Sequence, residues 1–364
     1  MSASLKPLVE TAIQAYIPPF SQQSLQQAKA IKSIEFRGTV CVLLIELGYP
    51  CKTVQPEMAA QLNQRVTAID GVDSLELTLT SKVVAHKAQA NLKSLKNVRN
   101  IIAIASGKGG VGKSTTTVNL ALALAAEGAR VGILDADIYG PSLGRMLGIE
   151  SGVKPEATDN AMYPIQAHGL QAMSMSFLVD EEQPMVWRGP MVSGALQQML
   201  TQTLWDDLDY LFVDMPPGTG DIQLTLSQKA PVTGSVIVTT PQDIALLDAR
   251  KGIEMFRKVD VPVLGIVENM SLHTCSECGH SEPIFGEGGG EQIAEQYQVD
   301  LLGRLPLKLS IRQQADAGQP SVVSQPAAEE SGFYREIALK LAASLAVRAK
   351  NFANVFPEIV VQND

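Results

Sequence analysis

Cysteines, long apolar runs and excess basic charge are all scarce in this chain of 364 residues. Its four cysteines are too few for a disulfide scaffold and favour a reducing compartment, so the cytoplasm is the expected location. No apolar run approaches the roughly 18 residues of a membrane span, and the N-terminus lacks the basic-then-apolar order of a signal peptide. The net charge of −9 argues against nucleic acid as the main partner, since phosphate binding needs a basic face. Neither a membrane nor a nucleic acid is therefore expected as a partner.

A glycine-rich loop between a predicted strand and a predicted helix is the most informative feature that is present. The apolar run 101–105 leads into the pattern Gly-x-x-x-x-Gly-Lys-Ser, a phosphate-binding loop. Its glycines let the backbone approach phosphate oxygens, and the following helix, roughly 113–127, points its positive N-terminal end at the same anion. Lys113 is expected at the β- and γ-phosphates and Ser114 at Mg²⁺. The predicted cofactors are ATP and Mg²⁺, and the predicted loop contacts are Gly107, Lys108, Gly109, Gly110, Val111, Gly112, Lys113, Ser114 and Thr115.

A second lysine inside the loop, Lys108, lies too early to duplicate Lys113. Its ammonium group can point away from the nucleotide of its own chain. The spacing resembles the deviant Walker A motif of the family that contains MinD, ParA, the arsenical pump ATPases and nitrogenase iron protein. This resemblance implies that Lys108 crosses a dimer interface and stabilises transition-state charge on the partner's nucleotide, much as an arginine finger does. The alternative is a solvated lysine on a loop.

Two more predicted strands end in carboxylates, and the carboxyl ends of strands are where open α/β sheets bind ligands. Asp135 and Asp137 follow the strand 131–134, and Asp214 follows the strand 210–213. Asp214 is placed like the Walker B carboxylate that holds Mg²⁺ through water. By resemblance, Asp137 positions the attacking water and Asp135 lies on the metal side. The predicted catalytic residues are therefore Lys108, Lys113 and Asp137, and the Pro-Pro-Gly-Thr-Gly stretch after Asp214 is expected to be a switch loop that senses the γ-phosphate.

A Cys-x-x-Cys pair, Cys275 and Cys278, follows another apolar strand. Such a pair brings two thiolates onto one metal, but neither zinc nor an iron–sulfur cluster is normally satisfied by two. Two chains related by a two-fold axis would supply four thiolates, the number that a [4Fe–4S] cluster uses, and Lys108 independently requires the same homodimer. A bridging Zn²⁺ fits four thiolates equally well, and the flanking His273 and His280 could be zinc ligands. Two cysteines without any metal are a further alternative.

Several separate motifs in the right order resemble the Mrp/ApbC family of iron–sulfur cluster carrier ATPases. They lie at 137–142, 187–191 and 214–221, and in the Asn-Met-Ser triplet that precedes the Cys-x-x-Cys. The resemblance covers about residues 98–345. It implies a homodimer that binds and hydrolyses ATP and holds a labile [4Fe–4S] cluster on Cys275 and Cys278 of both chains. It also implies an upstream scaffold as a partner, apo iron–sulfur proteins as clients, and a contact of Asn269 with the adenine ring.

Two rival functions share the deviant Walker A loop. A spatial organiser resembling MinD or ParA would use a basic amphipathic C-terminal helix or a basic face, and the tail 357–364 is neither. Its Cys-x-x-Cys would hold a structural zinc or no metal. An electron-transfer ATPase resembling nitrogenase iron protein takes its cluster ligands from two well-separated cysteines rather than from a Cys-x-x-Cys pair. Both rivals therefore fit this sequence less well than the carrier.

The predicted fold class is α/β: a doubly wound, mainly parallel sheet forms a P-loop NTPase domain, preceded by a small α/β N-terminal domain. Residues 1–82 form the small domain, which resembles domains of iron–sulfur assembly proteins. Residues 83–98 form a basic linker without acidic residues, expected to be solvated or to grip the acidic ATPase domain. Residues 99–364 form the ATPase domain.

The small domain is expected to hold a helix over 4–17, strands over 31–36, 40–47 and 74–80, and a helix over 55–69. The strand 40–47 is almost wholly apolar and should be central, with Cys41 in the core. Cys51 follows a Tyr-Pro turn that is expected to be exposed, so both a structural and a functional role for its thiol stay open. Further helices are expected over 191–204 and 329–351.

Overall fold

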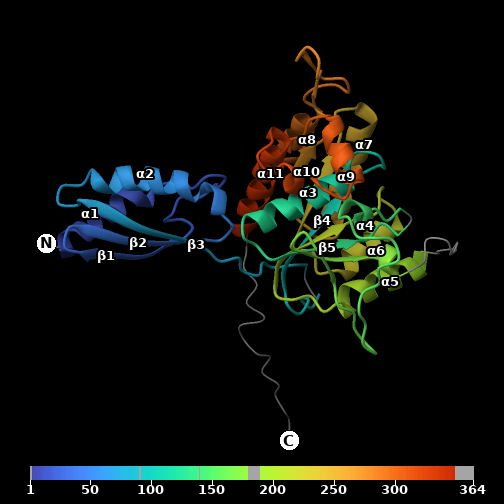
Figure 1. Cartoon of the computed structure of the whole chain (residues 1–364), viewed down its shortest axis with the longest axis horizontal. Helices are drawn as coiled ribbons and strands as arrows, with labels where there is room; N and C mark the ends of the chain where they lie inside the picture. The colour runs from blue at the N-terminus through green and yellow to red at the C-terminus, as the bar shows by residue number, and fades with distance from the viewer. Residues whose placement is uncertain (1, 90–91, 139, 179–188, 349–364) are drawn as a thin grey trace, which may run out of the picture.

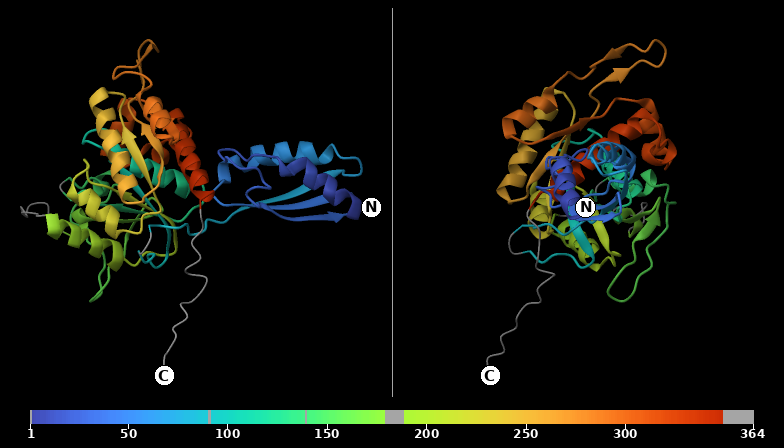
Figure 2. Two further views of the ribbon diagram at one scale, coloured as in Figure 1. Left: turned by 180° about the vertical axis from the view of Figure 1, so that it is seen from behind. Right: turned by 90° about the vertical axis from the view of Figure 1, so that its left-hand side faces the viewer.

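The computed structural model describes residues 2–89, 92–138, 140–178 and 189–348 (Figure 1). Three strands near the N-terminus form a sheet in the order β1-β2-β3, and eight strands form a second sheet in the order β13-β10-β9-β4-β8-β5-β7-β6. The small sheet and its helices project from one side of the larger body in Figure 1 and in the left-hand view of Figure 2. No helix within the described ranges is long and apolar enough to cross a bilayer.

The N-terminal layer is a sheet packed against two helices. β2 pairs antiparallel with β1 and parallel with β3, so the most apolar strand is central, as predicted. Alternate side chains of β2, including Cys41, are buried, because one face of the sheet is covered by helices. The elements are α1 Ser2–Gln14, β1 Ile31–Arg37, β2 Val40–Leu47, η1 Lys52–Val54, α2 Gln55–Thr67 and β3 Ser74–Ser81.

The expectation that Cys51 lies on an exposed turn is wrong. Its side chain is 1% exposed, and burial raises the pKa of the thiol, which a hydrogen bond from Gln55 partly offsets. The turn is covered because the next residues pack against the larger body, where the Thr53 N–H and hydroxyl both donate to the Glu127 carboxylate, at 2.8 and 2.5 Å. Cys51 is therefore a buried thiol next to the contact between the two sheets' layers.

The large sheet is mainly parallel and doubly wound, as predicted. Only β6 runs antiparallel to its neighbour within the eight described strands, and β4 lies between β8 and β9, where the strand order reverses. Its strands are β4 Val98–Ala105, β5 Val131–Asp135, β6 Ile165–Ala167, β7 Leu170–Ser174, β8 Leu208–Asp214, β9 Gly234–Thr239, β10 Val263–Glu268 and β13 Leu301–Arg304. The helices between and after them are α3 Lys113–Ala126, α4 Leu143–Met146, η2 Met175–Phe177, α5 Gly189–Gln202, α6 Asp221–Lys229, α7 Asp243–Lys258, α8 Gly289–Tyr297, α9 Leu309–Asp316, α10 Ser321–Ser324 and α11 Glu329–Ala346.

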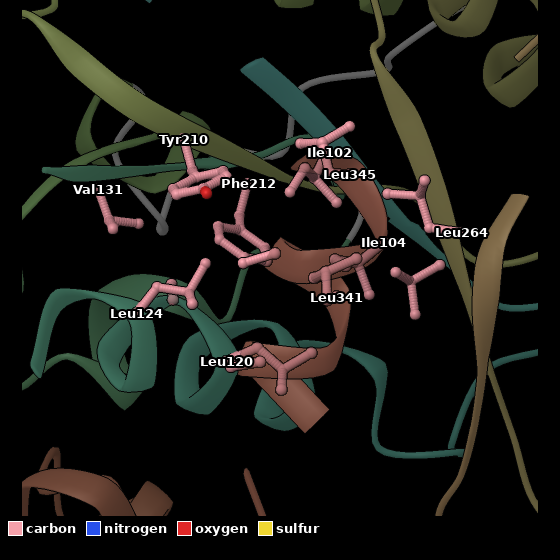
Figure 3. Close-up of a cluster of buried hydrophobic side chains, with 14 of the residues drawn as sticks. Ile102, Ile104, Leu120, Leu124, Val131, Tyr210, Phe212, Leu264, Leu341 and Leu345 are labelled. Atoms are coloured by element: carbon pink, nitrogen blue, oxygen red, sulfur yellow. The ribbon is translucent and has the colours of Figure 1, made fainter. Parts of the chain in front are cut away.

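Helices cover both faces of this sheet. The crossover through α3 moves in one direction along the sheet and those through α6, α7 and α8 move in the other, so right-handed connections place them on opposite faces. α11 packs beside α3. Figure 3 shows leucines of both helices against β4 and β8, with the labelled residues Leu120, Leu124, Leu341, Leu345, Ile102, Ile104 and Phe212. This core fixes the carboxyl ends of β4 and β8 relative to the start of α3.

The segment between the two sheets is fastened to the larger body along much of its length. The Gln89 side-chain amide donates to the carbonyl groups of Ser227 and Val259, at 2.6 and 2.9 Å. Arg99 makes ion pairs with Asp207 and Asp209, at 2.9 and 3.1 Å. Gln89 is uncharged and Arg99 lies within β4, so neither contact tests the basic linker over 83–98, which stays a prediction.

Candidate nucleotide site and cysteine hairpin

The glycine-rich loop joins β4 to α3, and its conformation depends on glycine at two positions. Gly112 has φ +82°, and a Cβ there would lie 2.2 Å from the Asn269 side-chain nitrogen. At Gly107 a Cβ would lie 2.3 Å from the Asp248 backbone carbon, so the loop passes directly against α7. The loop backbone is thus held open toward the N-terminus of α3, the arrangement that binds phosphate.

The Asp214 carboxylate lies at the centre of the site. It is fully buried at the end of β8 and accepts the Lys113 ammonium at 2.7 Å, the Ser114 hydroxyl at 2.6 Å and the Thr117 hydroxyl at 2.8 Å. Carboxylate and hydroxyl oxygens are the ligands that Mg²⁺ prefers, so Asp214 and Ser114 fit the predicted ion. The sequence analysis missed Thr117, although its hydroxyl group lies one helical turn after Lys113 and so could have been expected at the same site.

Asp135 lies beside Asp214, its register partner across β5 and β8, as its strand-end position predicts. The Asp135 carboxylate is buried and accepts the N–H groups of Asp137, Ser142 and Leu143 and the Ser174 hydroxyl, at 3.0 to 3.3 Å. Burial, and next the repulsion from Asp214, raises the pKa of Asp135 to about 7. Asp135 therefore holds the loop that presents the half-buried Asp137.

The stretch after Asp214 lies against the start of the phosphate loop. The Met215 N–H donates to the Ile104 carbonyl and the Gly218 N–H donates to the Ser106 carbonyl, both at 3.0 Å. Gly218 has φ +98°, a left-handed conformation that suits glycine. The predicted switch loop is thus hydrogen-bonded to the residues that flank the nucleotide site.

Lys108 points toward α7 rather than toward Asp214. Its ammonium group is 3.3 Å from the Gln242 side-chain oxygen, directly before the start of α7. On the first turns of α7, Ile244 and Leu247 are 71% and 52% exposed. The sequence analysis missed Gln242, although it lies just after the end of β9, as Asp135 and Asp214 lie at the ends of β5 and β8.

Asn269 connects the next strand end to the phosphate loop. Its backbone N–H donates to the Thr239 carbonyl, and its side-chain nitrogen donates to the Val111 carbonyl, both at 2.8 Å. The side chain is 8% exposed and lies over Gly112. Its contact with adenine stays a prediction.

The two cysteines lie on a short hairpin six residues further on, formed by β11 His273–Thr274 and β12 Ser281–Glu282. The hairpin stands out from the body in Figures 1 and 2, where it is orange. Cys278 is exposed and Cys275 partly so. Backbone N–H groups of Cys278 and Glu277 donate to the Cys275 sulfur and lower the pKa of its thiol.

The hairpin of one chain offers two thiols and no complete metal site. Within the described ranges no group of three or more His, Cys, Asp and Glu side chains is close enough to hold a metal. The His273 ring, named above as a possible zinc ligand, already makes a contact of 3.2 Å with the Leu307 carbonyl. Two thiols are half of the ligand set of a [4Fe–4S] cluster.

Comparison with known proteins identifies the family of the chain. The model of the NUBPL iron-transfer P-loop NTPase family matches residues 97–342. The iron-sulfur cluster carrier protein of Pseudomonas fragi is 62% identical over 76% of this chain and 97% of its own length. The iron-sulfur cluster carrier protein of Escherichia coli K12 is 50% identical over 94% of this chain and 93% of its own. The iron-sulfur cluster transfer protein NUBPL of Mus musculus is 51% identical over 74% and 84%.

Solved structures share the fold of the large sheet. A nucleotide-binding protein of Archaeoglobus fulgidus in complex with ADP is 38% identical with a TM-score of 0.55, over 61% of this chain and 88% of its own. The cell division ATPase MinD of Pyrococcus furiosus, 24% identical with a TM-score of 0.51, has the same fold. The chain belongs to the NUBPL iron-transfer P-loop NTPase family.

Proposed function

We propose that this chain is a homodimeric ATPase that binds a [4Fe–4S] cluster on Cys275 and Cys278 of both protomers and transfers it to apo-proteins. The observation that carries the proposal is the exposed cysteine hairpin, where backbone N–H groups lower the pKa of the Cys275 thiol and so favour the thiolate, the form that binds metals. The relatives named as iron–sulfur cluster carriers support the same cargo. The homodimer follows from ligand number, because two hairpins supply the four thiolates that the cluster needs.

The proposed roles in the nucleotide site follow from the network around Asp214. Asp214 and Ser114 hold Mg²⁺, which supplies charge neutralisation at the β- and γ-phosphates when bound. Lys113 is released from Asp214 to the phosphates, and the backbone of residues 107–115 donates to them. Asp137, held by Asp135, positions the attacking water. Lys108 leaves Gln242 and reaches the nucleotide of the partner protomer.

Two chains of contacts join the nucleotide site to the hairpin and support a coupling between ATP and the cluster. The first runs from Val111 through Asn269 along the short segment that ends at Cys275. The second runs from Lys108 through Gln242 to α7, against which the start of α8 packs so closely that a Cβ on Gly289 would lie 2.4 Å from Leu246. Nucleotide-dependent movement of the phosphate loop would therefore change the separation of the two hairpins in the dimer.

Anaerobic reconstitution with iron and sulfide tests the cargo. About four irons and four sulfides per dimer are expected for the wild type and none for Cys275→Ser/Cys278→Ser, while Cys51→Ala serves as the matched control, because that thiol is buried in the other layer. About one zinc per dimer, or a metal-free dimer, would overturn the carrier function. It would leave a structural clamp in an ATP-driven switch.

Cluster transfer to an apo-protein, with and without ATP, tests the coupling. We expect ATP to change the transfer rate of the wild type and to have little effect on Asn269→Ala, which removes the contact with Val111. An ATP effect of equal size in both proteins would show that this contact does not carry the signal. Leu204→Ser, at a distant exposed position, is the control.

A further inference from the structure

A groove of about 420 Å³ lies at the base of the cysteine hairpin. One wall is the hairpin itself, through Thr274 next to Cys275 and Pro283 directly after β12. The other walls come from the loop before α8, the segment after β13 and the first turns of α11. The groove is therefore the concave surface adjoining the thiols that are proposed to hold the cluster.

The floor and rim of the groove carry apolar side chains that no other part of the described chain covers fully. Leu272 lines it and is 40% exposed, and Ile284, which is 52% exposed, follows the lining residue Pro283. Pro306 and the half-buried Phe333 complete the apolar part. Exposed apolar side chains gathered beside polar ones are typical of binding surfaces.

The charges around the groove that are not neutralised by ion pairs within it are negative. Its two cations are each held between two carboxylates: Arg304 between Glu268 and Glu291, and Lys308 between Glu329 and Glu330. The exposed rim residue Glu287 has no ion pair within the described ranges, and the hairpin adds two exposed carboxylates, those of Glu277 and Glu282. A bound partner therefore meets apolar contacts surrounded by negative charge.

Building on the proposed carrier function, we propose that this groove docks the client polypeptide and selects an apolar side chain flanked by lysine or arginine. Apolar contact would supply affinity, and the opposite charges would steer the client and fix its orientation beside the cluster. A second copy of this chain is a poor occupant of the groove itself, because an isologous contact there would bring the groove carboxylates Glu287 and Glu291 of one copy against those of the other.

Peptide binding to the full-length dimer tests the groove. The probe is a fluorescein-labelled peptide with Leu-Phe at its centre and two lysines on each side, compared with counterparts that carry glutamates for the lysines or serines for Leu-Phe. Fluorescence anisotropy should show binding of the lysine peptide that is at least tenfold tighter than that of either counterpart and weakens with salt.

Substitutions in and away from the groove show where the peptide binds. Ile284→Ser and Glu287→Lys should each weaken the lysine peptide about tenfold, with cluster content and ATPase rate unchanged, because both side chains are exposed. Ile17→Ser and Glu10→Lys make the same changes at exposed positions of the small domain and should have no effect. The lysine peptide should also slow transfer to a protein acceptor without changing loss of the cluster to a small chelator.

Equal binding of the lysine and glutamate peptides, or groove variants that bind like the wild type, would overturn the inference. A shift of the monomer–dimer equilibrium in the groove variants would overturn it too, by assigning the groove to a second copy. Groove-dependent peptide binding by a wild type that assembles no cluster would instead refute the carrier function and leave the docking site standing.

Discussion

Gly112→Ala should weaken nucleotide binding by the phosphate loop through two separate effects, and the structure allows the free-energy cost of each to be worked out. At φ +82° a left-handed backbone costs an alanine about 1–2 kcal/mol. The new Cβ would lie 2.2 Å from the Asn269 side-chain nitrogen, so Asn269 must leave the Val111 carbonyl, at about 1–3 kcal/mol for an unsatisfied buried group. The sum of about 2–5 kcal/mol predicts a loss of nucleotide affinity from about 30-fold to a few thousandfold.

Equilibrium binding of a fluorescent ATP analogue measures this loss, and two further variants assign its cause. Gly194→Ala is the matched control, because a Cβ there meets nothing within 4 Å, its φ is not positive and it lies on α5 rather than in the phosphate loop, so affinity should not change. In an Asn269→Ala background the clash is absent, and Gly112→Ala should then cost only the left-handed backbone, about 1–2 kcal/mol. If Gly112→Ala is equally damaging in both backgrounds, the packing of Asn269 on Gly112 is not the reason for glycine at this position.

Three more predictions follow from buried and exposed groups elsewhere. Because the pKa of Asp135 is raised to about 7, the folded chain keeps a proton that the unfolded chain loses above about pH 4. The contribution of this group to the free energy of unfolding therefore falls as the pH rises from about 4 to about 7, by up to about 1.4 kcal/mol per pH unit. Urea unfolding without nucleotide should show this slope in the wild type and not in Asp135→Asn; parallel curves would refute it. Iodoacetamide should label Cys275 before Cys51 as followed by mass spectrometry, because hydrogen bonds lower the pKa of the first thiol and burial raises that of the second; equal rates would contradict both. Thr53→Val should lower the free energy of unfolding by about 1–3 kcal/mol, because it removes a hydrogen-bond donor from the buried Glu127 carboxylate. Thr39→Val, the control, removes an exposed hydrogen bond to Asp73 and should change the free energy of unfolding by less than about 1 kcal/mol. Equal losses would show that the bond to Glu127 stabilises the fold no more than an exposed one.

The fold of the large sheet could be predicted because its strands are buried on both faces and each ends in a distinctive residue. Continuous apolar runs identified β4, β5, β8 and β10; β5 and β8 end in aspartate, β10 ends in glutamate, and the glycine-rich loop follows β4. Parallel strands bring those ends to one edge, so the convergence of Lys113, Asp135 and Asp214 followed from local patterns alone.

Contacts between segments far apart in the chain could not be predicted in the same way. The exposure of Cys51 was inferred from its Tyr-Pro turn, but the thiol is buried, and Thr53, two residues on, binds Glu127 at the C-terminal end of α3, 74 positions away. A carboxylate at that end of a helix opposes the helix dipole, so only the donors from Thr53 and the Arg335 guanidinium at 3.7 Å make its burial tolerable. Nothing in either local sequence indicates that these partners meet.

Asn269 shows how one strand-end residue can serve both halves of the proposed function. Resemblance assigns it to adenine, whereas the structure binds its side chain to the phosphate loop and leaves five residues between it and Cys275. A loose segment of that length would absorb any displacement. This one is pinned, because the Ser271 N–H donates to the Leu305 carbonyl and the Leu307 N–H donates to the Leu272 carbonyl, at 3.0 and 2.8 Å. A shift of Val111 would therefore reach the base of the hairpin, and we expect loss of the Asn269 side chain to weaken the effect of ATP on cluster release while the cluster itself still assembles.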